Sequence, residues 1–198
     1  MPSEPTRVVV AITGASGAEY GVRALDLLDE MGVETHLVIT KAGIATLSHE
    51  TGFSAADVKK RASVVHSPYD LGAAISSGSF RVAGMLVAPC SVRALSGIAN
   101  SYDEDLVVRA ADVTLKERRR LVLLLRETPL HLNHLRLMTQ ATEAGAIIMP
   151  PVPAFYTRPG SVSDIIDDTV RRSLDLLGLD LQGLDVPNER RWDGDRSR

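Results

Sequence analysis

Residues 8–20, with the sequence VVVAITGASGAEY, decide the fold of this chain. Five apolar residues lead into Thr13, and two glycines follow within the next four positions. A short apolar run that ends at a glycine turn is typical of a buried strand. Apolar residues then recur three positions apart from Val22 to Met31, which is the spacing of a helix. The stretch therefore predicts a strand, a tight turn and a helix, whose first N–H groups would attract an anion such as phosphate.

The composition indicates one globular domain. The chain has 198 residues, of which 44% are hydrophobic and 24% are charged, and this balance is close to the average for folded proteins. We expect a single domain over residues 1–198, with a core from about 7 to 177 and a tail from 178 to 198. The net charge of −3 gives no reason to expect a nucleic-acid partner.

Neither a membrane segment nor a secretory signal is evident in the sequence. No apolar run approaches the roughly 20 residues that cross a bilayer, and residues 1–7 contain no apolar signal segment. One cysteine, Cys90, cannot form an intramolecular disulfide and suits a reducing compartment. We therefore expect a cytoplasmic protein without a membrane partner.

Apolar runs alternate with helical patterns along the chain. The predicted strands cover about residues 7–13, 34–40, 64–66, 84–90, 121–126 and 146–149. The predicted helices cover residues 18–31, 42–50, 55–61, a short segment capped by Ser91, 106–117, a segment from a Thr128–Pro129 cap to Ala144, and 163–177. Strands that are apolar on both faces indicate a parallel sheet covered on both sides. The predicted fold class is a doubly wound, three-layer α/β/α, Rossmann-like fold.

In such sheets, ligands bind beyond the carboxyl ends of the strands. Small or polar residues follow four of the predicted strands, and we expect the functional site where they meet: residues 14–17, Thr40, residues 90–93 and residues 126–128.

The first turn favours a mononucleotide over a dinucleotide. GASG lacks the three-glycine dinucleotide fingerprint, and no acidic residue ends the second strand to bind a ribose. Thr40 and Lys41 stand there instead, and a hydroxyl with a cation suits a phosphate, as in FMN. The alternative is that GASG only allows a strand and a helix to cross closely.

Charged residues later in the chain leave two interpretations open. Arg126 and Glu127 end an apolar strand, and they either bind a ligand or form a structural ion pair. Arg109 and Lys116 share a helix face with Asp112 between them, about 10.5 Å apart along the axis. A solvated, salt-bridged stripe is the alternative for that face.

Two chemistries are disfavoured. Cys90 has no evident base near it in sequence, so a small buried hydrophobe is favoured over a nucleophile. His131 and His134 lie three residues apart without an accompanying cysteine or aspartate cluster, so no metal site is expected.

Five segments occur together in one order: ITGASG, APCSVRALSGIA, RAADVTLKERR, RETPLHLNHL and PPVPAFYTRP. In this combination the chain resembles the flavin prenyltransferases, the UbiX family, over roughly residues 7–177. The resemblance implies a Rossmann-like flavoprotein that binds FMN and joins a dimethylallyl group from dimethylallyl monophosphate to N5 and C6 of reduced FMN. It also implies that the product, prenylated FMN, serves UbiD-type decarboxylases, as in ubiquinone synthesis, and that the chains form homo-dodecamers with shared sites.

The resemblance also implies roles for particular residues. The residues expected to bind FMN are Gly14, Ala15, Ser16, Thr40, Ser91, Val92, Arg93, Ala94 and Arg126. The residues expected to bind dimethylallyl monophosphate are Arg109, Lys116, Tyr156 and Arg172. The residues expected to handle protons are Ser16, Glu50 and Glu127. Thr40 and Ala94 replace a serine and a threonine that are common in the family, and Trp192 is a loose match to an aromatic over the prenyl group.

The expected chemistry needs no metal. Asp167 and Asp168 are followed by Thr169, Val170 and Arg171, so the aspartate-rich motif of metal-dependent prenyl transfer is missing, and fixed cations can stabilise a departing phosphate. Two alternatives remain. The first, an FMN-dependent cysteine decarboxylase of the same fold, is disfavoured because PVPAFYTRP lacks the Met-Asn segment of that group. The second is a non-catalytic flavin carrier.

Overall fold

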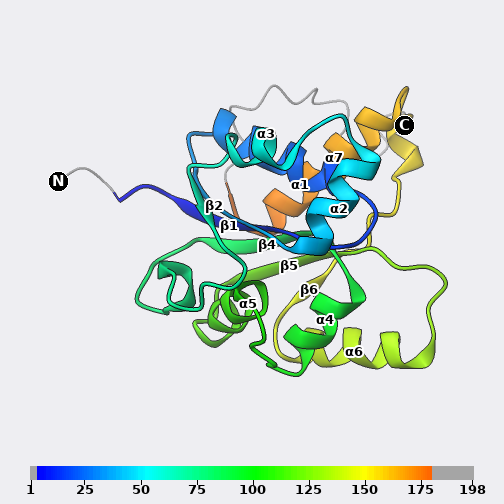
Figure 1. The fold of residues 1–198 in the computed structure, drawn as a ribbon. Helices are drawn as coiled ribbons and strands as arrows, with labels where there is room; N and C mark the ends of the chain where they lie inside the picture. The colour runs from blue at the N-terminus through cyan, green and yellow to red at the C-terminus, as the bar shows by residue number, and fades with distance from the viewer. Residues whose placement is uncertain (1–3, 180–198) are drawn as a thin grey trace, which may run out of the picture.

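The computed structural model describes residues 4–179, and within them six parallel strands form one sheet (Figure 1). The strands are β1 (Arg7–Ile12), β2 (Glu34–Ile39), β3 (Val64–His66), β4 (Gly84–Cys90), β5 (Arg120–Leu125) and β6 (Ile147–Ile148). Their order across the sheet is β3-β2-β1-β4-β5-β6. This is the order of a doubly wound Rossmann sheet, so the predicted fold class is confirmed.

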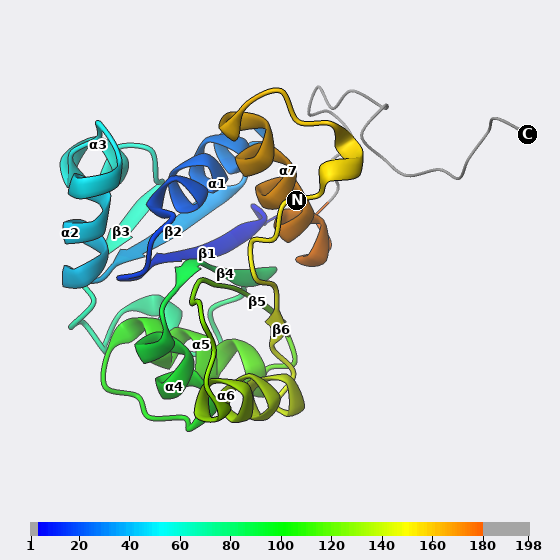
Figure 2. The ribbon, with the colours of Figure 1, turned by 90° about the vertical axis from the view of Figure 1, so that its right-hand side faces the viewer.

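Helices cover both faces of the sheet (Figures 1 and 2). One layer contains α1 (Ala18–Glu30), α2 (Lys41–Glu50), α3 (Ala55–Lys59) and α7 (Val162–Leu176). The other contains α4 (Val92–Ala99), α5 (Leu106–Lys116) and α6 (Leu132–Glu143). Two short 3₁₀ turns, η1 (Ala74–Ser76) and η2 (Phe155–Thr157), lie in the connections. In the described part of the chain, no helix is both long and apolar enough to span a bilayer.

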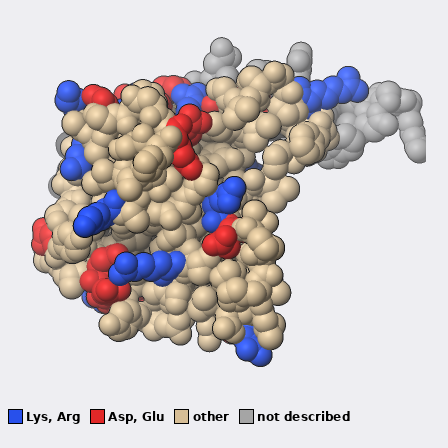
Figure 3. Space-filling model, turned by 45° about the vertical axis from the view of Figure 1, so that its right-hand side comes forward, with Lys and Arg blue, Asp and Glu red and all other residues tan. Residues whose placement is uncertain are grey.

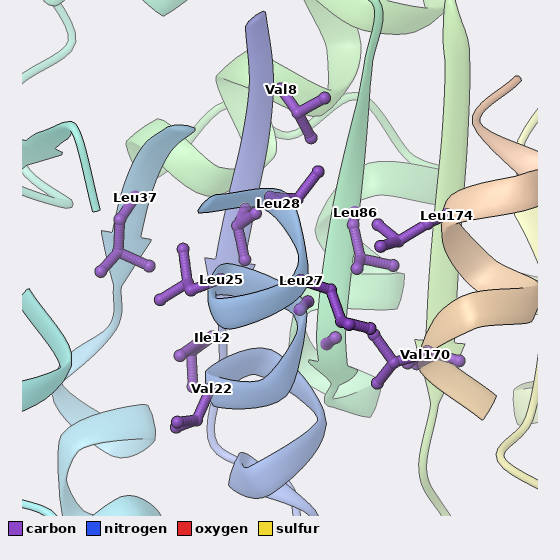
Figure 4. Packing of buried hydrophobic residues seen from close by; sticks show 14 of the residues in the cluster. Val8, Ile12, Val22, Leu25, Leu27, Leu28, Leu37, Leu86, Val170 and Leu174 are labelled. Carbon is purple, nitrogen blue, oxygen red and sulfur yellow. The ribbon is translucent and has the colours of Figure 1, made fainter. Parts of the chain in front are cut away.

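The sheet separates two apolar cores because side chains alternate along each strand. In β1, Val8 and Ile12 face α1 and α7, whereas Val9 and Ala11 face the layer of α4 and α5. Figure 4 shows the first core, where the side chains of α1, β4 and α7 interdigitate. A strand buried on both faces must be apolar at every position, which is why the apolar runs in the sequence coincide with the strands.

One predicted helix start is wrong. Thr128 and Pro129 do not begin a helix; they belong to an exposed loop after β5, and α6 begins only after His131. The Thr128 N–H donates to Oε1 of Glu127, while the imidazole of His131 accepts from the Asn133 N–H and caps the helix. The capping acceptor is therefore three residues later than the sequence indicated.

A glycine in α1 sets how closely that helix approaches the sheet. A Cβ atom on Gly21 would lie 2.3 Å from the carbonyl oxygen of Ala88 in β4 and 2.7 Å from Cγ1 of Ile12. We expect Gly21→Ala to destabilise the fold by about 1–3 kcal/mol, because overpacking against backbone outweighs the gain in helix propensity. Urea unfolding measures the change. Gly52→Ala is the control, since nothing lies within 4 Å of its added Cβ, and an equal loss in both variants would contradict the explanation.

Candidate functional site

A cavity of about 1080 Å³ opens at the carboxyl ends of the strands, where the sequence predicted the site. Its walls include all nine residues expected to bind FMN: Gly14, Ala15, Ser16, Thr40, Ser91, Val92, Arg93, Ala94 and Arg126. Glu127 and Lys41 line it as well. The volume is that of a site for a nucleotide-sized ligand. Four segments far apart in sequence thus meet at one edge of the sheet.

Hydrogen bonds hold the ends of β1, β2 and β4 together beneath this cavity. The hydroxyl of Thr13 donates to the carbonyl of Pro89 (2.7 Å) and accepts from the N–H of Ser91 (2.8 Å). The Thr40 N–H donates to the carbonyl of Ile12 (3.0 Å). Thr40 and Ser91 in turn cap α2 and α4 through their hydroxyl oxygens. The cavity floor is therefore a set of fixed hydroxyls and helix N-termini, which suits a phosphate.

The N-terminus of α1 was expected to attract a ligand phosphate, but a side chain of the protein occupies it instead. Gly17, with φ of 101°, turns the chain into α1. Its N–H donates to Oε2 of Glu50 (2.7 Å), and so does the N–H of Ala18 (3.1 Å). An anion does occupy the helix start, as helix electrostatics favours, but it is a side-chain carboxylate. A bound phosphate must therefore rely on other groups of the cavity.

Glu50 is held in its ionised form. Burial opposes ionisation, but hydrogen bonds from the Ser16 hydroxyl and from the N–H groups of Gly17 and Ala18, together with the charge of Arg126, lower the pKa of Glu50 overall. The Ser16 hydroxyl donates a hydrogen bond to this carboxylate, so a lone pair of the Ser16 oxygen stays available on the cavity side.

This shift gives a pH-dependent prediction. Because the folded-state pKa is lowered, Glu50 stabilises the fold above its unfolded pKa, and the contribution disappears as pH falls through the folded value. We expect Glu50→Ala to cost about 1 kcal/mol at pH 7, as for the loss of a helix cap, and progressively less as pH falls through the lowered folded-state pKa of Glu50. Urea unfolding of both proteins at several pH values measures the difference, and a constant difference across pH would contradict it.

Arg126 and Glu127 do not form the structural ion pair that the sequence left open: residues 4–179 show no salt bridge between them. Both are exposed in the loop after β5, and both line the cavity. The Arg126 N–H donates to the carbonyl of Cys90 (3.1 Å), which anchors the start of the loop at the end of β4. Their side chains are therefore placed for a ligand.

Two further residues expected to bind flavin also have protein partners at the cavity. The guanidinium of Arg93 pairs with the carboxylate of Glu104 at 3.1 Å, and this pair lies on the cavity wall. The Ala94 N–H donates to the hydroxyl of Ser91 (3.2 Å) as part of the α4 cap. Figure 3 shows one face of the molecule, where basic and acidic side chains are interspersed.

The four residues expected to bind the prenyl phosphate do not line this cavity in the described chain. Lys116 ends α5 and pairs with Glu117, and its Nζ lies against Gly78 in the loop before β4. Arg109 pairs with Asp103 (3.0 Å) and Asp112 (3.5 Å), so the predicted stripe on α5 is partly salt-bridged.

Tyr156 and Arg172 lie on η2 and α7, with most of each side chain exposed, and Arg172 pairs with Asp175. Trp192 lies outside the described residues.

Cys90 behaves as the small hydrophobe that the sequence favoured. Its side chain is fully buried, and burial raises the pKa of its thiol to about 12. A thiol that stays protonated at neutral pH is a poor nucleophile.

In residues 4–179, no group of three histidine, cysteine, aspartate or glutamate side chains is placed to hold a metal ion.

Sequence reasoning missed several cavity residues. Pro68 and Tyr69 follow the end of β3, and the strand-end rule would have found them had it been applied to that strand. Tyr102 and Glu104 also line the cavity, and they belong to a loop whose path the sequence pattern does not determine. His131 and His134, at the start of α6, line it as well.

A Rossmann sheet with a mononucleotide-sized cavity at its strand ends defines a nucleotide-binding domain, and the family model described as Flavoprotein, which matches residues 2–172, makes this domain a flavoprotein. The flavin prenyltransferase UbiX of Thauera aromatica is 54% identical over 192 residues, which are 97% of this chain and 96% of that protein. This chain therefore belongs to the flavin prenyltransferase family.

Two solved structures agree with this assignment. One is AnUbiX (PadA1) in complex with FMN and dimethylallyl pyrophosphate; it is 50% identical, has a TM-score of 0.89, and the match covers 93% of this chain and 98% of that one. The other is a dodecameric FMN-dependent UbiX-like decarboxylase from Escherichia coli O157:H7, with 48% identity and a TM-score of 0.89 over 96% of this chain and 100% of that one.

Proposed function

We propose that this protein is a flavin prenyltransferase that joins the dimethylallyl group of dimethylallyl monophosphate to N5 and C6 of reduced FMN. One observation carries the proposal. The cavity contains every expected flavin residue together with Glu127, in a chain 50% identical to a protein that binds FMN and dimethylallyl pyrophosphate.

The residues of the cavity suit FMN. The hydroxyls of Thr40 and Ser91 and the ammonium of Lys41 would hold the phosphate at the floor, where fixed dipoles already point into the cavity. The guanidinium of Arg126, which lines the same cavity, would also hold the flavin. When bound and reduced, the flavin supplies the nucleophilic atoms of the reaction.

We assign proton transfer to two carboxylates, Glu127 and Glu50, which have different tasks. Glu127 is exposed to the cavity and is the group we assign to accept the proton that leaves during ring closure. Glu50 holds its charge and orients the Ser16 hydroxyl, and we assign this hydroxyl to relay the proton that N5 of the reduced flavin loses when the dimethylallyl group bonds to it. Their environments differ, because Glu50 is fixed by two backbone N–H groups whereas Glu127 contacts only the N–H of its neighbour Thr128 among the hydrogen bonds that the described structure shows.

The leaving phosphate requires residues from more than one chain. Asp105, which caps the start of α5, lines the cavity, whereas Lys116 ends the helix about 15 Å further along its axis. Lys116 therefore lies toward the amino ends of the strands, away from the cavity at their carboxyl ends. We infer that another copy supplies Lys116 and Arg109 to this cavity, and that with Tyr156 and Arg172 they stabilise the departing charge without a metal.

The experiment is an anaerobic incubation of the protein with reduced FMN and dimethylallyl monophosphate, followed by mass spectrometry of the flavin. We expect the mass of prenylated FMN, and its absence would reject the proposal. A parallel reaction with dimethylallyl pyrophosphate tests which donor is used, because the solved relative contains the pyrophosphate. Decarboxylation of a peptidyl or pantothenoyl cysteine without a prenyl donor would favour the alternative cysteine decarboxylase.

We also propose a cellular location, an oligomeric state and a partner for this enzyme. We infer a cytoplasmic protein, since Cys90 is a free cysteine, and a homo-oligomer like the dodecameric relative. A UbiD-type decarboxylase would receive the prenylated flavin. Transfer of activity to an apo-decarboxylase on mixing would test that last step.

A further inference from the structure

Two histidines begin α6 on the wall of the cavity, and they form an unusual helix cap. Nδ1 of His131 accepts from the N–H of Asn133 (3.1 Å), while Nδ1 of His134 accepts from the N–H of His131 (3.5 Å). This reciprocal arrangement is a capping box, in which serine or threonine usually pairs with glutamate or glutamine. Here two imidazoles take the place of those side chains.

The cap uses Nδ1 of both rings as the acceptor atom. The two rings stack with their centroids 3.6 Å apart. Both histidines line the same cavity as Glu127.

The cap also fixes one end of the loop that carries Arg126 and Glu127. Residues 126–130 are all exposed, and the loop extends away from the end of β5 before it returns to α6 (Figure 1). The bond from the Arg126 N–H to Cys90 anchors its start. The start of α6 anchors its end, four residues after Glu127. Displacement of this helix start would move the loop and the Glu127 carboxylate.

We propose that His131 and His134 are positioning residues for prenyl transfer: their capping box holds the loop that presents Glu127 to the bound flavin. The inference rests on the proposed function, since it assigns these histidines to the same reaction. It differs from a metal site, which the described residues do not offer, and from direct catalysis, because the cap needs only an acceptor atom.

Substitutions that keep or remove the acceptor test this role. We expect His131→Ala to lower kcat about fivefold to tenfold with little change in KM for the prenyl donor. His131→Asn should restore kcat to within about twofold, because asparagine is among the best N-cap residues. His134→Gln should likewise retain activity, since glutamine is a usual partner in a capping box, whereas His134→Ala should not.

A second measurement and a matched control separate the possible outcomes. Ser54 caps α3 in a comparable box with Asp57, away from the cavity, so Ser54→Ala should lose similar stability without a fall in kcat. Hydrogen exchange at the Asn133 and His134 amides should speed up in His131→Ala and recover in His131→Asn. If asparagine and alanine reduce kcat equally, or if neither reduces it, the inference is overturned. A wild-type protein that makes no prenylated flavin would count against the proposed function instead, while exchange rates and FMN affinity still report on the cap.

Discussion

Glu127→Gln is expected to lower the rate of prenyl transfer by about 100-fold to 10,000-fold, the usual contribution of a positioned general base. Glutamine has nearly the same size as glutamate, and it can still accept a hydrogen bond from the Thr128 N–H. It cannot accept a proton from the flavin at neutral pH. The loss should therefore appear in kcat and not in FMN affinity.

Single-turnover rates with reduced FMN, together with fluorescence titration of FMN, measure the two quantities separately. Glu143→Gln is the matched control, because it removes the same charge from the exposed far end of α6. Unchanged flavin binding together with unchanged complementation in Glu127→Gln would favour the flavin carrier. A loss of FMN affinity in proportion to the loss of rate would assign Glu127 to binding.

The fold was predictable because its strands are buried on both faces. Every residue of β4 is buried, so its apolar run in the sequence marks both the strand and its position inside the sheet. The parallel arrangement then collects the strand ends, which is why the sequence pattern alone predicts that Thr40, Ser91 and Arg126 share one cavity. At these three positions the apolar pattern of each strand and the parallel order of the sheet therefore predict the same location.

The tertiary contacts of the site were not predictable in the same way. Glu50 contacts Gly17 from 33 residues away, and no pattern of spacing reports such a contact. The start of α6 was misplaced because histidine is not a favoured N-cap, whereas Thr128 followed by proline is a strong local signal. The position of Lys116 could have been predicted. A helix between two parallel strands runs antiparallel to them, so the last residue of α5 lies far from the carboxyl ends of the strands.

Because α5 carries Lys116 away from the cavity of its own chain, we expect mixed oligomers of two inactive variants to regain activity. Lys116→Ala and Glu127→Gln should each be nearly inactive, since one removes a cation from the leaving phosphate and the other the proton acceptor. If Lys116 comes from a different copy than Glu127, a mixed oligomer contains some sites with both residues intact. With random assembly of equal amounts, about one quarter of the sites are restored, because the cavity chain and the donor chain must each be the suitable variant.

Co-expression of the two variants with different affinity tags, followed by purification through both tags, would yield the mixed oligomers. We expect activity to rise from near zero to about one quarter of the wild-type value. A mixture of Glu127→Gln with Arg126→Ala is the matched control, because both residues line the cavity of the same chain and no combination restores a complete site. Equal inactivity in both mixtures would show that Lys116 acts within its own chain. Restoration in the first mixture alone would mean that the isolated chain cannot carry out the reaction, which gives a catalytic reason for the assembly.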